Sequence, residues 1–223
     1  MIPSKTVESF QELYKKGYNK DYPSIELVRI HKSIITKSHN KILDYGSGHG
    51  ANGIHFLNNG FEVTFCDISK KSIYDVKKKI KNLKYKKAEF IHLKNYNIFL
   101  KKNYNEKFNV IICMSVINNL TSLKQMHYLL NIFYKILKPG GFLIIDTNYI
   151  KNNYKIIKQL NKNTILTSFN EKNKKPFKMC FPTNQKQFLK IIKNTKFKIL
   201  DIGHYSFKIF NNFEKEDIFT IKK

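Results

Sequence analysis

Between residues 41 and 147 the chain alternates short apolar runs with amphipathic segments, and this alternation constrains the fold more than any other feature. Strands are predicted at 41–45, 61–67, 88–93, 108–115 and 142–147, and helices at 50–59, 69–82 and 121–138. Strands separated by helices form βαβ units, whose parallel sheet is covered on both faces. We expect Ser69 and Thr121 to cap two of the helices, and Pro139-Gly140-Gly141 to end the third.

The flanking segments have a different texture. Two helices, at 4–17 and 24–37, are predicted before the alternating region. After it, residues 148–180 are rich in lysine and asparagine, with weak helical periodicity around 149–160, and a helix follows at 183–194. The runs at 197–207 and 217–222 lie close enough in sequence to form an antiparallel pair of strands. We therefore predict an α/β fold with a doubly wound, mostly parallel sheet that ends in an antiparallel hairpin.

The net charge of +25 has two open interpretations. It is typical of proteins that bind nucleic acid or another polyanion. However, 40 of the 41 basic residues are lysine, and Arg29 is the single arginine, whereas RNA-binding surfaces use the planar arginine fork. Abundant Lys, Asn and Ile also fit the codon bias of an AT-rich genome. In either case the lysines would attract phosphate-bearing molecules.

Cysteine usage and hydropathy indicate the cellular compartment and whether a membrane span is expected. Cys66, Cys113 and Cys180 are far apart and odd in number, so we expect buried thiols in a reducing, cytoplasmic protein, without a disulfide or metal site. No apolar run approaches the roughly 20 residues of a membrane span, so no span is expected.

The stretch ILDYGSGHGANG, residues 42–53, places glycines at 46, 48 and 50 between a predicted strand and helix. Backbone N–H groups at such a helix start attract ligands, and glycines let a ligand approach the backbone. Asp67 ends the next strand, where its carboxylate can accept hydrogen bonds from both ribose hydroxyls; capping of the following helix is its alternative role. From these residues alone, a dinucleotide and S-adenosylmethionine both remain open as ligands.

Four stretches in order, ILDYGSGHG, VTFCDIS, FNVIICMSVINNL and ILKPGGFLIID, resemble the class I S-adenosylmethionine-dependent methyltransferases. The resemblance covers residues 41–147 and implies a Rossmann-like, seven-stranded sheet with a reversed last strand. It implies S-adenosylmethionine as cofactor and S-adenosylhomocysteine as product. Dinucleotide dehydrogenases fit less well, because about 40 residues precede the glycine turn and KPGG would be unexplained. The implied organisation is a single domain, 1–223, with a helical lid at 1–40, a cofactor-binding core at 41–147, and a substrate insert and closing hairpin at 148–223.

The resemblance also implies a set of cofactor-binding residues. They are Tyr22, Arg29, Asp44, Gly46, Ser47, Gly48, Gly50, Asn52, Asp67, Ile68, Asn95, Met114 and Ser115. Asp44 either attracts the amino group of the methionine end or accepts backbone N–H bonds within the turn. The family often has an adenine-binding acid after the third strand; this chain reads FIHLKNYN there, so Asn95 or backbone groups would replace it. Arg29 is either a clamp for an anionic group or an ordinary surface residue.

Methyl transfer needs positioning and, for an oxygen or nitrogen acceptor, a base near the methyl group. The candidates for this base are Asp146, His127 and His204, and no metal is required. Between residues 113 and 120 the chain lacks both the Asn/Asp-Pro-Pro-aromatic motif and the Pro-Cys nucleophile of nucleic-acid enzymes, which favours a small-molecule acceptor. The lysines of 148–180 suggest that it bears phosphate or a nucleotide, as surface-polysaccharide precursors do. An RNA or protein methyltransferase, and a non-catalytic cofactor-binding protein, are the alternatives; a monomer or homodimer is expected.

Overall fold

The computed structural model describes residues 2–81, 87–149, 154–169, 175–209 and 212–223. Its main sheet has seven strands in the order β3-β2-β1-β4-β5-β10-β9. The strands are β1 (Lys41–Tyr45), β2 (Glu62–Asp67), β3 (Ala88–His92), β4 (Phe108–Cys113), β5 (Leu137–Thr147), β9 (Lys198–Ile209) and β10 (Asn212–Lys222). β1 to β5 pair in parallel, whereas β10 pairs antiparallel with both β5 and β9. The predicted doubly wound sheet with a closing hairpin is confirmed.

Helices cover both faces of this sheet, as strands buried on both sides require. The helices are α1 (Ser4–Lys15), α2 (Ile25–Ile34), α3 (Ala51–Asn58), α4 (Lys70–Lys81), α5 (Leu123–Ile136) and α6 (Gln185–Lys193), with short 3₁₀ turns η1 (Tyr96–Leu100), η2 (Lys102–Tyr104) and η3 (Ile117–Asn119). Apolar residues of α2, α3 and α4 form one core cluster with the sheet, and those of η1, α5 and α6 form the other. The strands therefore alternate side chains between two separate cores.

Helix ends follow local hydrogen bonding. Ser69 caps α4, since its Oγ accepts the N–H of Ser72 at 3.3 Å, as predicted. The prediction for Thr121 is wrong by one residue, because Ser122 Oγ accepts the N–H of Gln125 at 3.2 Å. The extended backbone after α5 begins at Leu137, so Pro139-Gly140-Gly141 lies inside β5 instead of before it.

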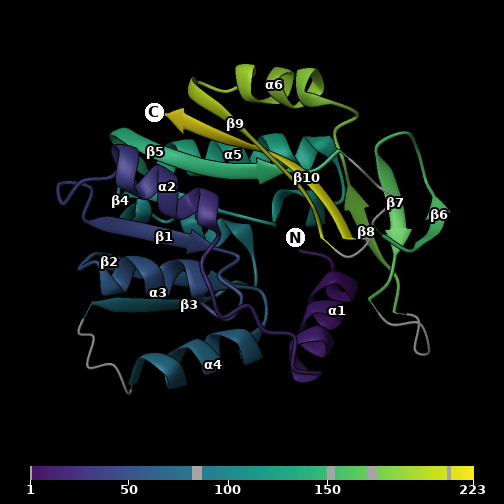
Figure 1. The fold of residues 1–223 in the computed structure, drawn as a ribbon, viewed down its shortest axis with the longest axis horizontal. Helices are drawn as coiled ribbons and strands as arrows, with labels where there is room; N and C mark the ends of the chain where they lie inside the picture. The colour runs from purple at the N-terminus through teal and green to yellow at the C-terminus, as the bar shows by residue number, and fades with distance from the viewer. Residues whose placement is uncertain (1, 82–86, 150–153, 170–174, 210–211) are drawn as a thin grey trace.

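Residues after β5 depart from the expected helix. Ile156–Gln159 (β6) forms a three-stranded antiparallel sheet with Thr164–Thr167 (β7) and Phe177–Cys180 (β8). The helical periodicity around 149–160 is thus wrong for 156–159, while 150–153 lie outside the described residues. Figure 1 shows this small sheet and α1 beyond the arrowheads of the parallel strands, where the chain can enclose a site.

Two further expectations concern the cysteines and membrane-spanning helices. The three cysteines are buried thiols that form no disulfide with one another, as predicted. Within the described ranges, no helix is both long and apolar enough to cross a bilayer.

Candidate functional site

The glycine turn is held against β2 and packed on three sides. The N–H groups of Gly46 and Ser47 donate to the carbonyl of Cys66 at 2.7 and 3.0 Å. Gly46, Gly48 and Gly50 have φ of +74°, +52° and +83°, the left-handed region that favours glycine. A Cβ on Gly46 would lie 2.3 Å from Val116 Cγ2, and one on Gly50 would lie 2.9 Å from Val76 Cγ2. The missing side chains therefore admit neighbouring elements as well as a ligand.

Two buried aspartates fix the turn from below. Asp44 Oδ2 accepts the N–H of Gly53 at 2.9 Å, and Asp67 accepts the N–H groups of Gly48 and Ser69 at 2.9 and 2.7 Å. Burial raises the pKa of Asp44 to about 7 and that of Asp67 to about 6, against the opposing effect of these N–H donors. Asp67 therefore supports the glycine turn and also holds Ser69, the residue that caps α4.

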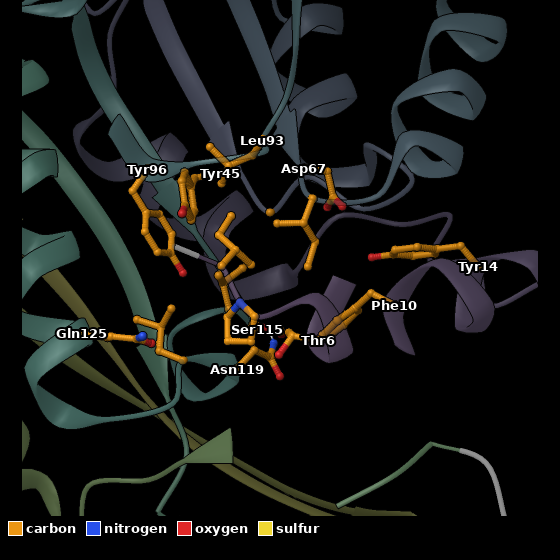
Figure 2. Close-up of a pocket in the computed structure, with 16 residues that line it drawn as sticks. Thr6, Phe10, Tyr14, Tyr45, Asp67, Leu93, Tyr96, Ser115, Asn119 and Gln125 are labelled. Carbon is orange, nitrogen blue, oxygen red and sulfur yellow. Dashed lines mark hydrogen bonds between the residues drawn. The ribbon is translucent and has the colours of Figure 1, made fainter. Parts of the chain in front are cut away.

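A small cavity of about 80 Å³ opens beside Asp67 (Figure 2). Asp67, Leu93 and Tyr96 lie along one side of it, and Ser115, Asn119 and Gln125 lie along the opposite side. The N-terminal segment closes the cavity. Ile2 and Pro3 lie just before α1, and Thr6, Phe10 and Tyr14 lie within this helix. The Oγ1 of Thr6 is buried without a hydrogen-bond partner, so it can bind a ligand.

A large cavity of about 360 Å³ adjoins the small one and shares Phe10, Tyr14, Gly46, Ser115 and Asn119 with it. Its further lining comes from segments far apart in the chain. That lining is Leu13, Tyr18, Lys20, Ser47, Gly48, His49, Ala51, Asn52, Met114, Asn118, Asp146, Tyr154, Phe169, Met179 and Glu216. The Oγ of Ser47 is buried without a partner. Together the cavities run across the carboxyl ends of β1, β2, β4 and β5, where open α/β sheets bind ligands.

Between the cavities, Ser115 has a strained backbone with φ of +57°. Both carboxylate oxygens of Asp146 accept its N–H, at 2.7 and 2.8 Å. Burial raises the pKa of Asp146 to about 6, while the N–H of Ser115, the charge of Lys20 and a hydrogen bond with Glu216 act to lower it. Asp146 therefore positions the loop after β4 and also faces the large cavity.

The structure brings many predicted site residues together. Those lining a cavity are Gly46, Ser47, Gly48, Asn52, Asp67, Ile68, Met114, Ser115 and Asp146. Asn52 also contacts the residue before α2, because its Oδ1 accepts the N–H of Ser24 at 3.0 Å. Asp44 and Gly50 act behind the turn and are not among the described lining residues.

Five predicted residues have other surroundings and do not line either cavity within the described ranges. Tyr22 is 82% exposed, and Arg29 lies on the exposed side of α2. Asn95 caps η1 by accepting the N–H of Asn97 at 2.9 Å. His127 Nε2 contacts the carbonyl of Asn194 after α6, and His204 Nδ1 pairs with Asp217 at 2.8 Å. Asn95, His127 and His204 thus have local hydrogen-bond partners, and the roles of all five residues at the site stay predictions.

The residues that sequence reasoning missed come mainly from α1 and from the segment after β5. From α1, Phe10 and Tyr14 line both cavities and Thr6 lines the small one, while Glu216 reaches the large cavity from β10. Tyr154, Phe169 and Met179 belong to the lysine-rich, aromatic insert. The lid and the insert were predicted as regions, but no spacing within them identifies the inward-facing side chains.

Comparison with known proteins agrees with this geometry. Residues 43–143 match the family model of a methyltransferase domain. Two relatives are a histidine protein methyltransferase 1 homolog of Dictyostelium discoideum, 30% identical over 128 residues, and a ubiquinone biosynthesis O-methyltransferase of Rickettsia typhi, 27% identical over 165 residues. The matches cover 53% and 66% of this chain but only 40% and 61% of the relatives' own lengths.

A solved structure shares the whole architecture. A crystal structure of a SAM-dependent methyltransferase from Methanosarcina mazei superposes with a TM-score of 0.72 at 16% identity, covering 87% of this chain and 96% of that one. This likeness shows the fold. Residues 43–143, which hold the glycine turn, Asp67 and strands β2 to β4, therefore match a methyltransferase domain, and the chain has the fold of a SAM-dependent methyltransferase.

Proposed function

We propose that this protein transfers the methyl group of S-adenosylmethionine to an oxygen or nitrogen atom of a small molecule. One observation carries the proposal: two adjoining cavities share Gly46 and Ser115, and each contains one buried carboxyl group, Asp67 or Asp146. This arrangement suits a nucleoside on one side and a methyl acceptor on the other.

The residues present fit the cofactor. The carboxylate of Asp67 faces the small cavity, where it can accept hydrogen bonds from the ribose hydroxyls. Ile68, Leu93 and Val116 give apolar walls for the adenine ring. The hydroxyls of Thr6 and Ser47 are buried without partners, as expected of groups that bind a ligand. When bound, the cofactor supplies a methyl group on a positively charged sulfur, which leaves as S-adenosylhomocysteine.

The chain's own contribution is to position the reactants and to exclude water. The turn held by Asp44 and Asp67 presents its backbone to the cofactor, while α1 covers both cavities. In this proposal residues 1–40 act as a lid, 41–147 as the cofactor-binding core, and 148–223 as the acceptor insert and closing hairpin of one domain.

The finer sequence-based expectations have unequal support. An anionic acceptor such as a phosphate-bearing polysaccharide precursor is a prediction from net charge, and the charged groups of the large cavity are Lys20 opposed by Asp146 and Glu216. A protein acceptor is the second candidate, because one relative is a histidine protein methyltransferase homolog. A cytoplasmic location is consistent with three buried thiols, and a monomer or homodimer remains the expectation.

Calorimetric titration with S-adenosylmethionine tests the proposal. Asp67→Ala is expected to lower the affinity at least 100-fold while the protein stays folded by circular dichroism. Asp201→Ala is the matched control, because Asp201 is exposed on β9 and lines neither cavity in the described part. Equal affinity in the Asp67 variant and the natural chain would contradict the ribose assignment. Transfer of labelled methyl to the small-molecule fraction of a cell extract, and not to its protein fraction, distinguishes the two acceptors.

A further inference from the structure

The large cavity has a charge that is unusual for so basic a chain. Among the described residues, Lys20 is the single lysine that lines it, and its Nζ also donates to Ser24 Oγ at 3.0 Å. Two carboxyl groups, Asp146 and Glu216, face the same space. A pocket for a phosphate group would present several lysine or arginine donors. The lining therefore argues against a phosphate on the part of the acceptor that enters this cavity.

The two carboxyl groups form a joined pair. Asp146 pairs with Ile218 across β5 and β10, so Glu216 lies two residues along the strand on the same face of the sheet. Both side chains also line the large cavity, so the two carboxyl groups are neighbours in the same space. A carboxylate at this place can accept a proton from a bound acceptor.

Aromatic side chains enclose the rest of the cavity. Phe10 and Tyr14 come from α1, while Tyr154 and Phe169 come from the segment after β5. The rings of Phe10 and Phe169 meet edge to face, with centroids 5.1 Å apart. Phe169 nevertheless remains 41% exposed. Flat, polarisable walls from two separate segments favour a planar apolar ligand, since aromatic rings pack well against one another.

We propose that the acceptor is a planar aromatic or heteroaromatic compound with a hydroxyl or amino group, and that the Glu216–Asp146 pair takes up its proton. This inference rests on the proposed function. The acceptor's O–H or N–H proton passes to a carboxylate oxygen of Glu216, beside the carboxyl group of Asp146. The acceptor atom forms its new bond to the methyl carbon, and the electrons of the broken carbon–sulfur bond remain on sulfur.

Transfer of labelled methyl to matched compounds tests the acceptor class. We expect 2,3-dihydroxynaphthalene to be methylated with a kcat/KM at least tenfold above that of its monophosphate ester and of glucose 1-phosphate. A preference for either phosphate, or no transfer to the naphthalene, would overturn the inference. Calorimetric binding of S-adenosylmethionine, measured in parallel, separates this failure from failure of the proposed function.

The carboxyl pair is tested by Glu216→Gln, with Glu62→Gln as the control. Glu62 pairs with Lys87 beside the amino end of β2, away from both cavities. We expect Glu216→Gln to lower kcat on 2,3-dihydroxynaphthalene at least tenfold, with cofactor affinity unchanged within twofold. The loss should shrink to less than threefold on 4-nitrocatechol at a pH where this compound is ionised, because its proton has already left.

A merely structural role for Glu216 predicts the same loss on both compounds, and that result would refute the proton transfer. The absorbance of bound 4-nitrocatechol reports its ionisation without turnover. Phe169→Leu provides a second variant, expected to weaken naphthalene binding about three- to tenfold by fluorescence titration. Unchanged binding in this variant would contradict the proposal that Phe169 forms an aromatic wall for the acceptor.

Discussion

The two halves of the site are built in different ways. On the cofactor side, residues 44–72 form a continuous strand-turn-helix unit whose polar contacts run largely through backbone N–H and carbonyl groups. On the acceptor side, the walls come from α1, the loop after β4, the segment after β5, and β10. A site that binds its ligand through backbone groups requires a local sequence motif, whereas a cavity assembled from distant side chains produces no such motif.

We expect Gly46→Ala to have the largest effect on cofactor binding. A small effect would contradict the contrast between the two halves of the site. Gly46 lines both cavities, and the new Cβ would lie 2.3 Å from Val116 Cγ2 at a left-handed φ. We expect S-adenosylmethionine binding to become undetectable by calorimetry. Gly17→Ala carries the same backbone strain, about 1–2 kcal/mol, at φ of +89° with no atom within 4 Å. If Gly17→Ala lost binding equally, general strain would explain the result.

Asn118→Ala tests whether the acceptor side depends on one buried amide. Its Nδ2 donates to the carbonyls of Asn148 and Cys180, both at 3.1 Å, and its Oδ1 accepts the N–H of Asn148 at 2.9 Å. Since these buried groups would lose their partner, the free energy of unfolding should fall by about 2–4 kcal/mol in urea denaturation. Acceptor turnover should fall more than cofactor affinity; the reverse order would contradict the division into two halves.

The pH dependence of cofactor affinity sharpens the role of the carboxylates. Burial raises the pKa of Asp67 to about 6 and that of Asp44 to about 7, and hydroxyls and amines bind the ionised forms best. S-adenosylmethionine affinity should therefore fall as pH falls, by up to roughly tenfold per unit below pH 6 where Asp67 alone contacts the cofactor, and by up to roughly a hundredfold per unit where Asp44 contacts it as well. Calorimetry between pH 5 and 8 measures this slope. An affinity independent of pH would show that neither carboxylate contacts the cofactor directly.

Thr6→Val should have the smallest effect. The Oγ1 of Thr6 has no partner in the protein, so the melting temperature of the free protein should stay within about 2 °C. Affinity for S-adenosylmethionine should fall about two- to tenfold, the range expected for one neutral hydrogen bond. A drop in melting temperature with unchanged affinity would assign this hydroxyl to folding instead of binding.

Much of the core could be predicted, because its signals are local. Apolar runs such as 108–113 and the turn ending in Gly50 fix strands and a helix start within a few residues. Asp67 was found because the spacing of a βαβ unit places it beside the turn. The wrong helix at 156–159 has a physical reason: four exposed residues, Ile156–Gln159, become a strand by pairing with β7, which is a tertiary effect.

The remaining differences between expectation and structure concern side-chain direction. His127 and Asn95 follow strands that end at the site, yet they point to the α6 end and to η1. Glu216 could not be selected, because its approach to Asp146 depends on the antiparallel register of β10 with β5. Spacing in the sequence gives the edge of a sheet on which a residue lies, but pairing between distant strands decides what it contacts.

Helix α1 is shared by the two halves of the site. Phe10 and Tyr14 belong to the walls of both cavities, so one helix bounds the nucleoside and the acceptor alike. A displacement of α1 that opened the small cavity would therefore open the large cavity as well. Access to the two cavities is linked through this one helix.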